Sequence, residues 1–233
     1  MSSARELVKS TLQKRGWELN RVAHGGAGRR ARLLSRLQVE QVLDVGANTG
    51  QYAQSLRAAG YDGPIVSFEP LPDAYTELLK TAAGDDRWEA HNVALGAADG
   101  TIEFNVSRDG VCSSVLAPTS TLRGAIPQAE LVSRISVPVR TLDTFAPEGR
   151  ALLKIDTQGF EHQVLAGADR SLDNVVALDI EMALVELYEG GSSIYSLLPH
   201  LHERGFRVLS IDSGFVDPET DQTLDVDVLL VRA

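Results

Sequence analysis

Acidic and glycine residues recur where short apolar runs end, and ligands of α/β proteins commonly bind at such points. The run Val42-Leu43-Asp44-Val45 is followed directly by Gly46-Ala47-Asn48-Thr49-Gly50. Glycines at a turn let a ligand approach the backbone closely, and Asp44 can accept hydrogen bonds from an amine or a hydroxyl. We therefore expect a small-molecule site at this turn, with Asn48 either capping the following helix or contacting the ligand.

A second acidic residue follows the next apolar run, in Phe68-Glu69-Pro70, 19 residues after Gly50. A carboxylate at the end of the second strand of an α/β sheet is placed to accept hydrogen bonds from both hydroxyls of a ribose. The glycine turn lacks the third glycine of the GxGxxG pattern, which leaves less room for a pyrophosphate. The pattern therefore favours a nucleoside with a charged amino-acid tail over a dinucleotide.

Two further carboxylates end later apolar runs: Asp156 follows the run 152–155, and Glu181 follows the run 175–180. If these runs are neighbouring parallel strands, both carboxylates lie on one rim of the sheet. Such a pair suits two chemistries, removal of a proton by a general base and binding of a divalent ion such as Mg2+. Asp156 and Glu181 are therefore candidate catalytic residues and candidate metal ligands.

The elements that hold these residues alternate between strand and helix patterns. Short apolar runs typical of parallel strands buried on both faces occur at 42–45, 65–68, 88–94, 152–155 and 175–180. Helical segments are expected at 51–59, 72–83, 161–168 and 194–204. Two final strands, at 207–211 and 226–231, have no helix between them. We predict an α/β fold: a doubly wound, mostly parallel seven-stranded sheet with a C-terminal antiparallel hairpin.

One long segment, residues 110–138, shows no clear periodicity and is rich in Ser and Thr. A segment of this kind is expected to form an irregular loop inserted over the ligand site.

Composition and charge narrow the class of protein. The chain has 233 residues, of which 43% are hydrophobic and 23% charged, as is ordinary for a globular protein. The net charge of −10 argues against a nucleic-acid binder, and the single cysteine excludes an internal disulfide. Because we find no apolar stretch long enough to span a membrane and no signal-peptide pattern, we expect a cytoplasmic protein without a transmembrane segment.

The basic residues are concentrated near the N-terminus. Residues 1–40 hold nine of the 22 Lys and Arg residues but three of the 32 acidic ones. We predict a basic helical N-terminal extension over 1–40 and a ligand-binding domain over 41–233. The favoured interpretation of the extension is a solvated helix with one stripe packed on the domain, and a helix that lies on an anionic lipid or substrate is the alternative.

Four motifs, taken together, resemble those of the FkbM family of S-adenosylmethionine-dependent methyltransferases. They are Asp44-Val45-Gly46-Ala47-Asn48-Thr49-Gly50-Gln51-Tyr52, Phe68-Glu69-Pro70, Asn92-Val93-Ala94-Leu95-Gly96 and Leu153-Lys154-Ile155-Asp156-Thr157-Gln158-Gly159-Phe160-Glu161. The resemblance runs from about residue 41 to the C-terminus. It implies the Rossmann-like class I methyltransferase fold, whose last strand inserts antiparallel, and makes 41–233 the methyltransferase domain.

The resemblance also implies which residues surround the cofactor. Those expected around the methionine tail are Asp44, Gly46, Asn48, Gly50 and Tyr52. Those expected at the ribose are Glu69 and the adjacent Pro70. Those expected to flank the adenine are Asn92 and Val93. A serine-containing stretch of the family is matched by Ser113 and Ser114.

The function implied by the resemblance is transfer of a methyl group to a hydroxyl of a sugar-containing acceptor, such as a glycolipid, a glycoside or a natural product. An alcohol is a poor nucleophile until its proton is removed, so Asp156 is the first candidate base, and Glu181 shares that task or orients a sugar hydroxyl. Mg2+ held by the same carboxylates is the alternative. The expected partners are a small-molecule or glycolipid acceptor and a second copy in a homodimer, with no nucleic acid.

Two other functions remain open at this stage. One is a nicotinamide-dependent oxidoreductase on a similar sheet, which the missing third glycine disfavours. The other is a non-catalytic nucleoside-binding protein, which the carboxylates at two strand ends disfavour.

Overall fold

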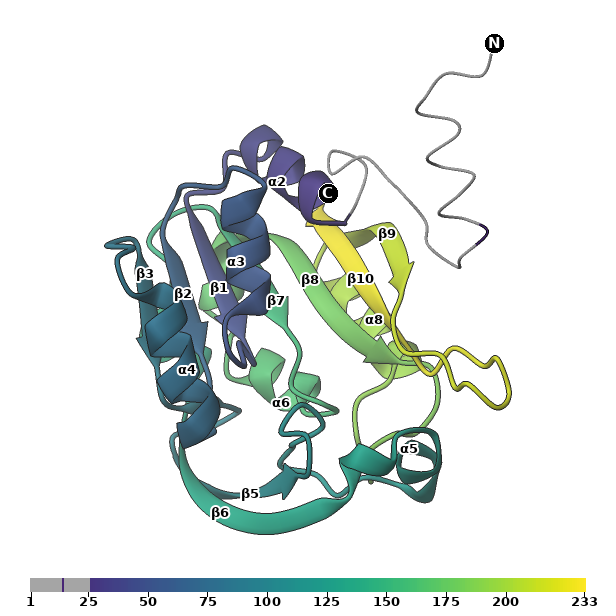
Figure 1. Ribbon diagram of the computed structural model, residues 1–233. Coiled ribbons are helices and arrows are strands. Elements are labelled where there is room, and N and C mark those ends of the chain that lie inside the picture. The colour runs from purple at the N-terminus through teal and green to yellow at the C-terminus, as the bar shows by residue number, and fades with distance from the viewer. Residues whose placement is uncertain (1–13, 15–25) are drawn as a thin grey trace.

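The computed structural model describes residue 14 and residues 26–233, and its centre is a seven-stranded sheet (Figure 1). The strand order is β3-β2-β1-β7-β8-β10-β9. The parallel strands are β1 (Gln41–Val45), β2 (Ile65–Phe68), β3 (Trp88–His91), β7 (Ala151–Ile155) and β8 (Val175–Ala183). Strand β10 (Asp225–Arg232) runs antiparallel to β8 and to β9 (Phe206–Ser213). The predicted mostly parallel sheet with a C-terminal hairpin is confirmed.

Helices cover both faces of this sheet because successive strand residues point to opposite sides. On β1, Val42 belongs to one buried apolar cluster and Leu43 to the other. The helices that pack on the Val42 face are α2 (Gly26–Arg36), α3 (Gln51–Ala58) and α4 (Pro72–Ala82). Those that pack on the Leu43 face are α6 (Glu161–Ala166), α7 (Ser171–Asn174) and α8 (Ile194–Glu203). In the described part of the chain, no helix is both long and apolar enough to cross a membrane.

Helix α2 lies within the predicted N-terminal extension and is packed against the sheet domain. Leu33 and Leu34 are 3% and 1% exposed and join the apolar cluster that includes Leu56 of α3. The rest of the predicted extension, apart from residue 14 and residues 37–40, lies outside the described residues. Residues 26–36 therefore contribute to the core on which the predicted domain is built.

A second, three-stranded sheet corrects the prediction of an irregular loop over 110–138. Its order is β4-β6-β5, with β4 (Ala94–Leu95), β5 (Gly100–Ser107) and β6 (Leu131–Arg140). Strand β6 and the short helices α5 (Ser120–Ala125) and η2 (Pro127–Ala129) lie wholly or largely in the segment expected to be irregular. The prediction was wrong there because β6 is exposed over most of its length and contains Pro138, so it lacks the apolar run that marks a buried strand. A further 3-10 turn, η3 (Leu142–Phe145), leads into β7.

Candidate active site

A cavity of about 420 Å³ lies at the carboxyl ends of β1, β2, β7 and β8. In the sheet, β2 lies on one side of β1 and β7 lies on the other, so the strand order reverses next to β1. Open α/β sheets bind ligands at the carboxyl ends of the strands at such a point. The small sheet and the loop that follows β5 supply a further wall, through Phe104, Val111 and Ser113. Both sheets therefore contribute to the wall of the cavity.

The glycine turn after β1 is shaped by contacts within the protein. Gly46 has φ of 73°, and a Cβ there would lie 1.8 Å from the carbonyl oxygen of Asp156. Gly50 has φ of 93°, and a Cβ there would lie 2.9 Å from the ring of Trp88. At both positions glycine allows left-handed backbone and close packing between neighbouring segments. Gly46 also lines the cavity, whereas Gly50 does not.

Behind this turn, a row of polar residues crosses four strands at one level. Ser67, Asp44, Lys154 and Asp179 are paired in register from β2 through β1 and β7 to β8. Lys154 Nζ lies 3.4 Å from Asp44 Oδ1 and donates to the carbonyl oxygen of Gly46 at 2.7 Å. Burial opposes the charge of Lys154, but Asp156 and Asp44 outweigh that effect, so the pKa of Lys154 is raised. The ammonium group therefore ties the end of β1 to β7.

The second buried carboxylate of the row, Asp179, is held by two helices. It is 3% exposed and forms an ion pair with Arg30 of α2. Tyr52 of α3 donates its hydroxyl to the same carboxylate at 2.9 Å. Burial and the charge of Asp179 both raise the pKa of Tyr52, which keeps its hydroxyl protonated. Arg30 and Tyr52 also line the cavity, so this contact forms part of its wall.

Glu69 links the turns that follow β1 and β2. Its carboxylate accepts hydrogen bonds from the backbone N–H of Asn48 and from that of Leu71, each at 2.8 Å, one on each oxygen. The residue is 5% exposed, and burial raises its pKa despite these two donors. Each oxygen keeps a lone pair, so a ribose could still donate both hydroxyls to it.

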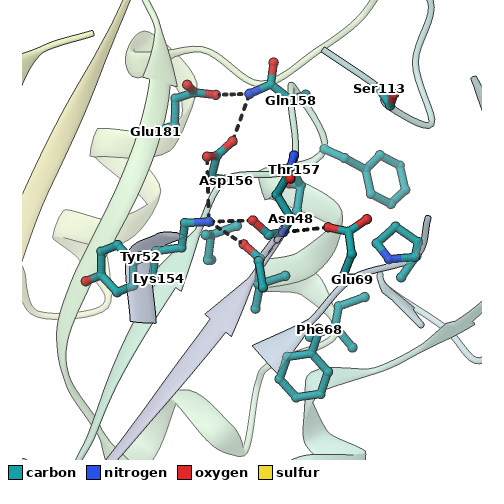
Figure 2. Close-up of a pocket in the computed structure, with 18 of the residues that line it drawn as sticks. Asn48, Tyr52, Phe68, Glu69, Ser113, Lys154, Asp156, Thr157, Gln158 and Glu181 are labelled. Atoms are coloured by element: carbon teal, nitrogen blue, oxygen red, sulfur yellow. Dashed lines mark hydrogen bonds and ion pairs between the residues drawn. The ribbon is translucent and has the colours of Figure 1, made fainter. Parts of the chain in front are cut away.

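The two rim carboxylates are brought together as predicted, with an amide between them (Figure 2). Gln158 Nε2 donates to Asp156 Oδ1 and to Glu181 Oε2, each at 2.8 Å. Asp156 Oδ2 lies 3.6 Å from Lys154 Nζ. Burial and the charge of Asp156 raise the pKa of Glu181 well above its ordinary value.

This arrangement does not support the predicted Mg2+ site. The group between Asp156 and Glu181 is an N–H donor, and a cation would need oxygen ligands there instead. Among the residues that the structure describes, no group of three or more His, Cys, Asp or Glu side chains is arranged to hold a metal ion. The donor set therefore gives no support to a divalent ion between Asp156 and Glu181.

The predicted site residues divide into two sets by position. Those that line the cavity are Gly46, Asn48, Tyr52, Glu69, Pro70, Val93, Ser113, Asp156 and Glu181. Those that stand outside the lining are Asp44, Gly50, Asn92 and Ser114. The sequence predicts that the residues of the second set also contact the ligand, but they lie behind the residues that line the cavity. Asn92 Nδ2 donates to the carbonyl oxygens of Glu69 and Pro70, and Ser114 Oγ donates to that of Gln158.

Several residues that line the cavity were not predicted as site residues from the sequence. Lys154 and Asp179 each interrupt an apolar run, and a lone charge inside such a run is a signal of a buried partner. Arg30 gave no comparable signal, because it stands among other arginines in a basic segment. Phe104 and Val111 could not be placed because the small sheet that positions them was not predicted.

Comparison with known proteins places this site in a family. The sequence model of one protein family, the methyltransferase FkbM domain, matches residues 44–208 of this chain. A 2-O-methyltransferase, NoeI, of Sinorhizobium fredii (strain NBRC 101917 / NGR234) is 28% identical over 168 residues, which are 67% of this chain and 69% of that protein. The crystal structure of the methyltransferase FkbM of Methylobacillus flagellatus KT has a TM-score of 0.51 at 14% identity, covering 82% of this chain. The match covers 43% of that longer chain and supports the fold alone.

The family match bears on one of the two alternatives that the sequence left open. It spans the glycine turn, Glu69 and both rim carboxylates, and it selects a methyltransferase over a nicotinamide-dependent oxidoreductase. The chain belongs to the FkbM family of S-adenosylmethionine-dependent methyltransferases.

Proposed function

We propose that this protein transfers the methyl group of S-adenosylmethionine to a hydroxyl of a sugar-containing acceptor. The observation that carries the proposal is the arrangement of one cavity. Figure 2 draws Glu69 on one side of it and the Asp156–Gln158–Glu181 group on the other. A ribose-binding carboxylate and a proton-accepting pair in one cavity fit a nucleoside cofactor that meets an alcohol.

The lining residues fit this cofactor part by part. Glu69 offers one lone pair on each oxygen to the ribose hydroxyls. Val93, Phe104 and Phe160 give an apolar wall for the adenine. The turn at Gly46 and the side chain of Tyr52 face the space left for the methionine tail. When bound, S-adenosylmethionine supplies a methyl group on a positively charged sulfur.

The rim carboxylates would handle the proton of the acceptor. As the acceptor oxygen takes the methyl group, its proton passes to Asp156 or Glu181, and the sulfur leaves as a neutral thioether. Burial and the charge of Asp156 raise the pKa of Glu181, which strengthens its affinity for a proton. Lys154, 3.6 Å from Asp156, offsets part of the negative charge of the pair.

The acceptor class is proposed from the relative and from the donors in the cavity. The 28% identical relative carries the name 2-O-methyltransferase, which indicates transfer to an oxygen at position 2. Carboxylate and amide groups such as Asp156, Glu181 and Gln158 are suited to hydrogen-bond neighbouring sugar hydroxyls. We therefore propose a sugar hydroxyl flanked by another hydroxyl as the site of methylation.

The cofactor is tested by calorimetric titration with S-adenosylhomocysteine. Wild-type protein is expected to bind it, and Glu69→Ala is expected to lose that binding because the ribose loses both of its acceptors. Absence of binding to the wild-type protein would refute the proposed cofactor.

The acceptor is tested with S-adenosylmethionine carrying a radiolabelled methyl group and a panel of methyl pyranosides. Each sugar with a free 2-hydroxyl is compared with its 2-deoxy counterpart. Label is expected in at least one 2-hydroxy sugar and not in its 2-deoxy partner. If both members of a pair are labelled equally, the proposed position is wrong. If no sugar is labelled although the cofactor binds, the sugar class is wrong.

A further inference from the structure

Gln158 stands between the two carboxylates in a backbone conformation that few residues adopt. Its φ is 56°, in the left-handed region, and Gly159 follows with φ of 94°. The carbonyl oxygen of Gln158 accepts a hydrogen bond of 2.7 Å from Ser114 Oγ, on the loop after β5. A backbone held in this conformation by a neighbouring loop fixes the point from which the amide reaches Asp156 and Glu181.

The other end of that amide contacts Tyr188. Its hydroxyl lies 2.6 Å from Gln158 Oε1 and 3.1 Å from the carbonyl oxygen of Cys112. A flipped amide would set Oε1 against two carboxylate oxygens, so Nε2 faces the carboxylates and Oε1 faces Tyr188. Tyr188 is 3% exposed, and burial raises the pKa of its hydroxyl, which therefore remains a donor. A chain of hydrogen bonds thus runs from Tyr188 through Gln158 to both carboxylates.

We propose that Gln158 is a positioning residue for methyl transfer: its amide holds Asp156 and Glu181 together beside the acceptor hydroxyl, and Tyr188 orients the amide. The proposal rests on the proposed function, in which those carboxylates receive the proton. Two adjacent carboxylates repel each other, and a donor shared between them offsets that repulsion. Gln158 would therefore set how readily the pair takes up a proton.

Other charged groups also surround Glu181 and remain unchanged in the test. They are Asp225 and Asp227 of β10, Glu161 of α6 and, across Asp156, Lys154 of β7. A change in the titration of Glu181 can therefore be assigned to the substituted residue.

The test is an NMR titration of the Glu181 carboxyl, labelled with 13C, in the full-length protein. Gln158→Met keeps the length of the side chain and removes the N–H donor. The pKa of Glu181 is expected to rise by about one to two pH units, because a hydrogen bond to the charged form is lost. Tyr188→Phe removes the hydroxyl that orients the amide, and a smaller rise is expected. Matched controls are Gln163→Met and Tyr195→Phe, at exposed positions of α6 and α8, with no change expected.

The outcomes separate the two parts of the proposal. A Glu181 pKa that is the same in Gln158→Met as in the wild type overturns the positioning role of Gln158. A rise in Gln158→Met without one in Tyr188→Phe overturns the orienting role of Tyr188 alone. If Gln158→Met does not fold, Tyr188→Phe decides, since it leaves the backbone at 158 untouched: a rise supports the proposal, and no rise overturns it.

A second readout uses the methyl-transfer assay. Gln158→Met is expected to lower kcat by about 10- to 100-fold and to change KM for S-adenosylmethionine by less than about threefold, because the amide acts on the base. Equal loss in both constants overturns the positioning role. The NMR titration needs neither cofactor nor acceptor, so a wild-type protein that fails to bind S-adenosylhomocysteine refutes the proposed function and leaves the titration result to be judged separately.

Discussion

Replacing Glu69 by Gln tests whether this carboxylate is the ribose acceptor. In the structure both of its oxygens accept backbone N–H groups at 2.8 Å, from Asn48 and Leu71. Glutamine has one oxygen, so its NH2 group must face one of those N–H donors whichever way the amide is turned. An unsatisfied buried donor costs about 1–3 kcal/mol of stability. Burial raises the pKa of Glu69, so removing the charge recovers part of this cost, and a net loss near 1 kcal/mol is expected.

Cofactor affinity is expected to fall further than stability. The substituted side chain also loses an acceptor for one ribose hydroxyl, and hydrogen bonds to charged groups are worth about 1.5–3 kcal/mol. At about 1.4 kcal/mol per tenfold change, S-adenosylhomocysteine should bind about 10- to 100-fold more weakly to Glu69→Gln. The measurements are calorimetric titration and urea unfolding, with Glu103→Gln, at an exposed position of β5, as the control for the change in charge.

One result would refute this reasoning about Glu69. If Glu69→Gln folds stably and binds S-adenosylhomocysteine within about threefold of the wild type, the carboxylate does not bind the ribose. Its two backbone hydrogen bonds would then be a structural link between the turns after β1 and β2.

Three further predictions concern the frame of the site. Gly46→Ala should lower the free energy of unfolding by at least about 3 kcal/mol, because its Cβ meets a backbone carbonyl at 1.8 Å in left-handed backbone; a loss below about 1 kcal/mol in urea unfolding would contradict that packing. Arg30→Met should lower the free energy of unfolding by about 3–5 kcal/mol, because it leaves the buried Asp179 without its cation. Arg29→Met removes an ion pair that is more than a third exposed and should lower it by at most about 1 kcal/mol. Equal losses in the two variants would refute this distinction between a buried and an exposed ion pair. Burial and the charge of Asp179 raise the pKa of Asp227 to about 6, so this residue should make stability fall as pH rises from about 4 to about 6. Asp227→Asn should therefore reduce the slope of stability against pH in that range; parallel stability curves for variant and wild type would refute it.

The main sheet was predictable because its strands are short apolar runs that end at turn residues. Strands β1, β2 and β7 are buried over almost their whole length, so the runs at 42–45, 65–68 and 152–155 mark them closely. Strand β6 carries no such mark, since alternate residues near its end are buried and the remainder faces solvent. Its place is set by pairing with β5, a contact between segments that sequence periodicity does not reveal.

The rim of the site was predictable for the same reason as the sheet. Parallel strands end at one edge, so the residues that follow β1, β2 and β7 must lie near one another. The sequence could not show that Asn92 supports the turn at Glu69 from behind, because its side chain bonds to backbone carbonyls. Nor could it show that Gln158 reaches both Asp156 and Glu181, because that depends on a left-handed backbone at a residue other than glycine.

The polar row across the sheet shows how the fold separates structural charges from those available for chemistry. Asp44, Lys154 and Asp179 are adjacent in register on β1, β7 and β8, and Arg30 adds a second cation, so two carboxylates meet two cations. Strand side chains repeat every two residues, which places Glu181 on the same face as Asp179, one step nearer the cavity. Its charge has no buried cation of its own in the described part of the chain, and burial raises its pKa. The charges of the row formed by Asp44, Lys154 and Asp179 are thus neutralised, and this row fixes the strand ends. The rim carboxylates Asp156 and Glu181 keep the capacity to take up a proton.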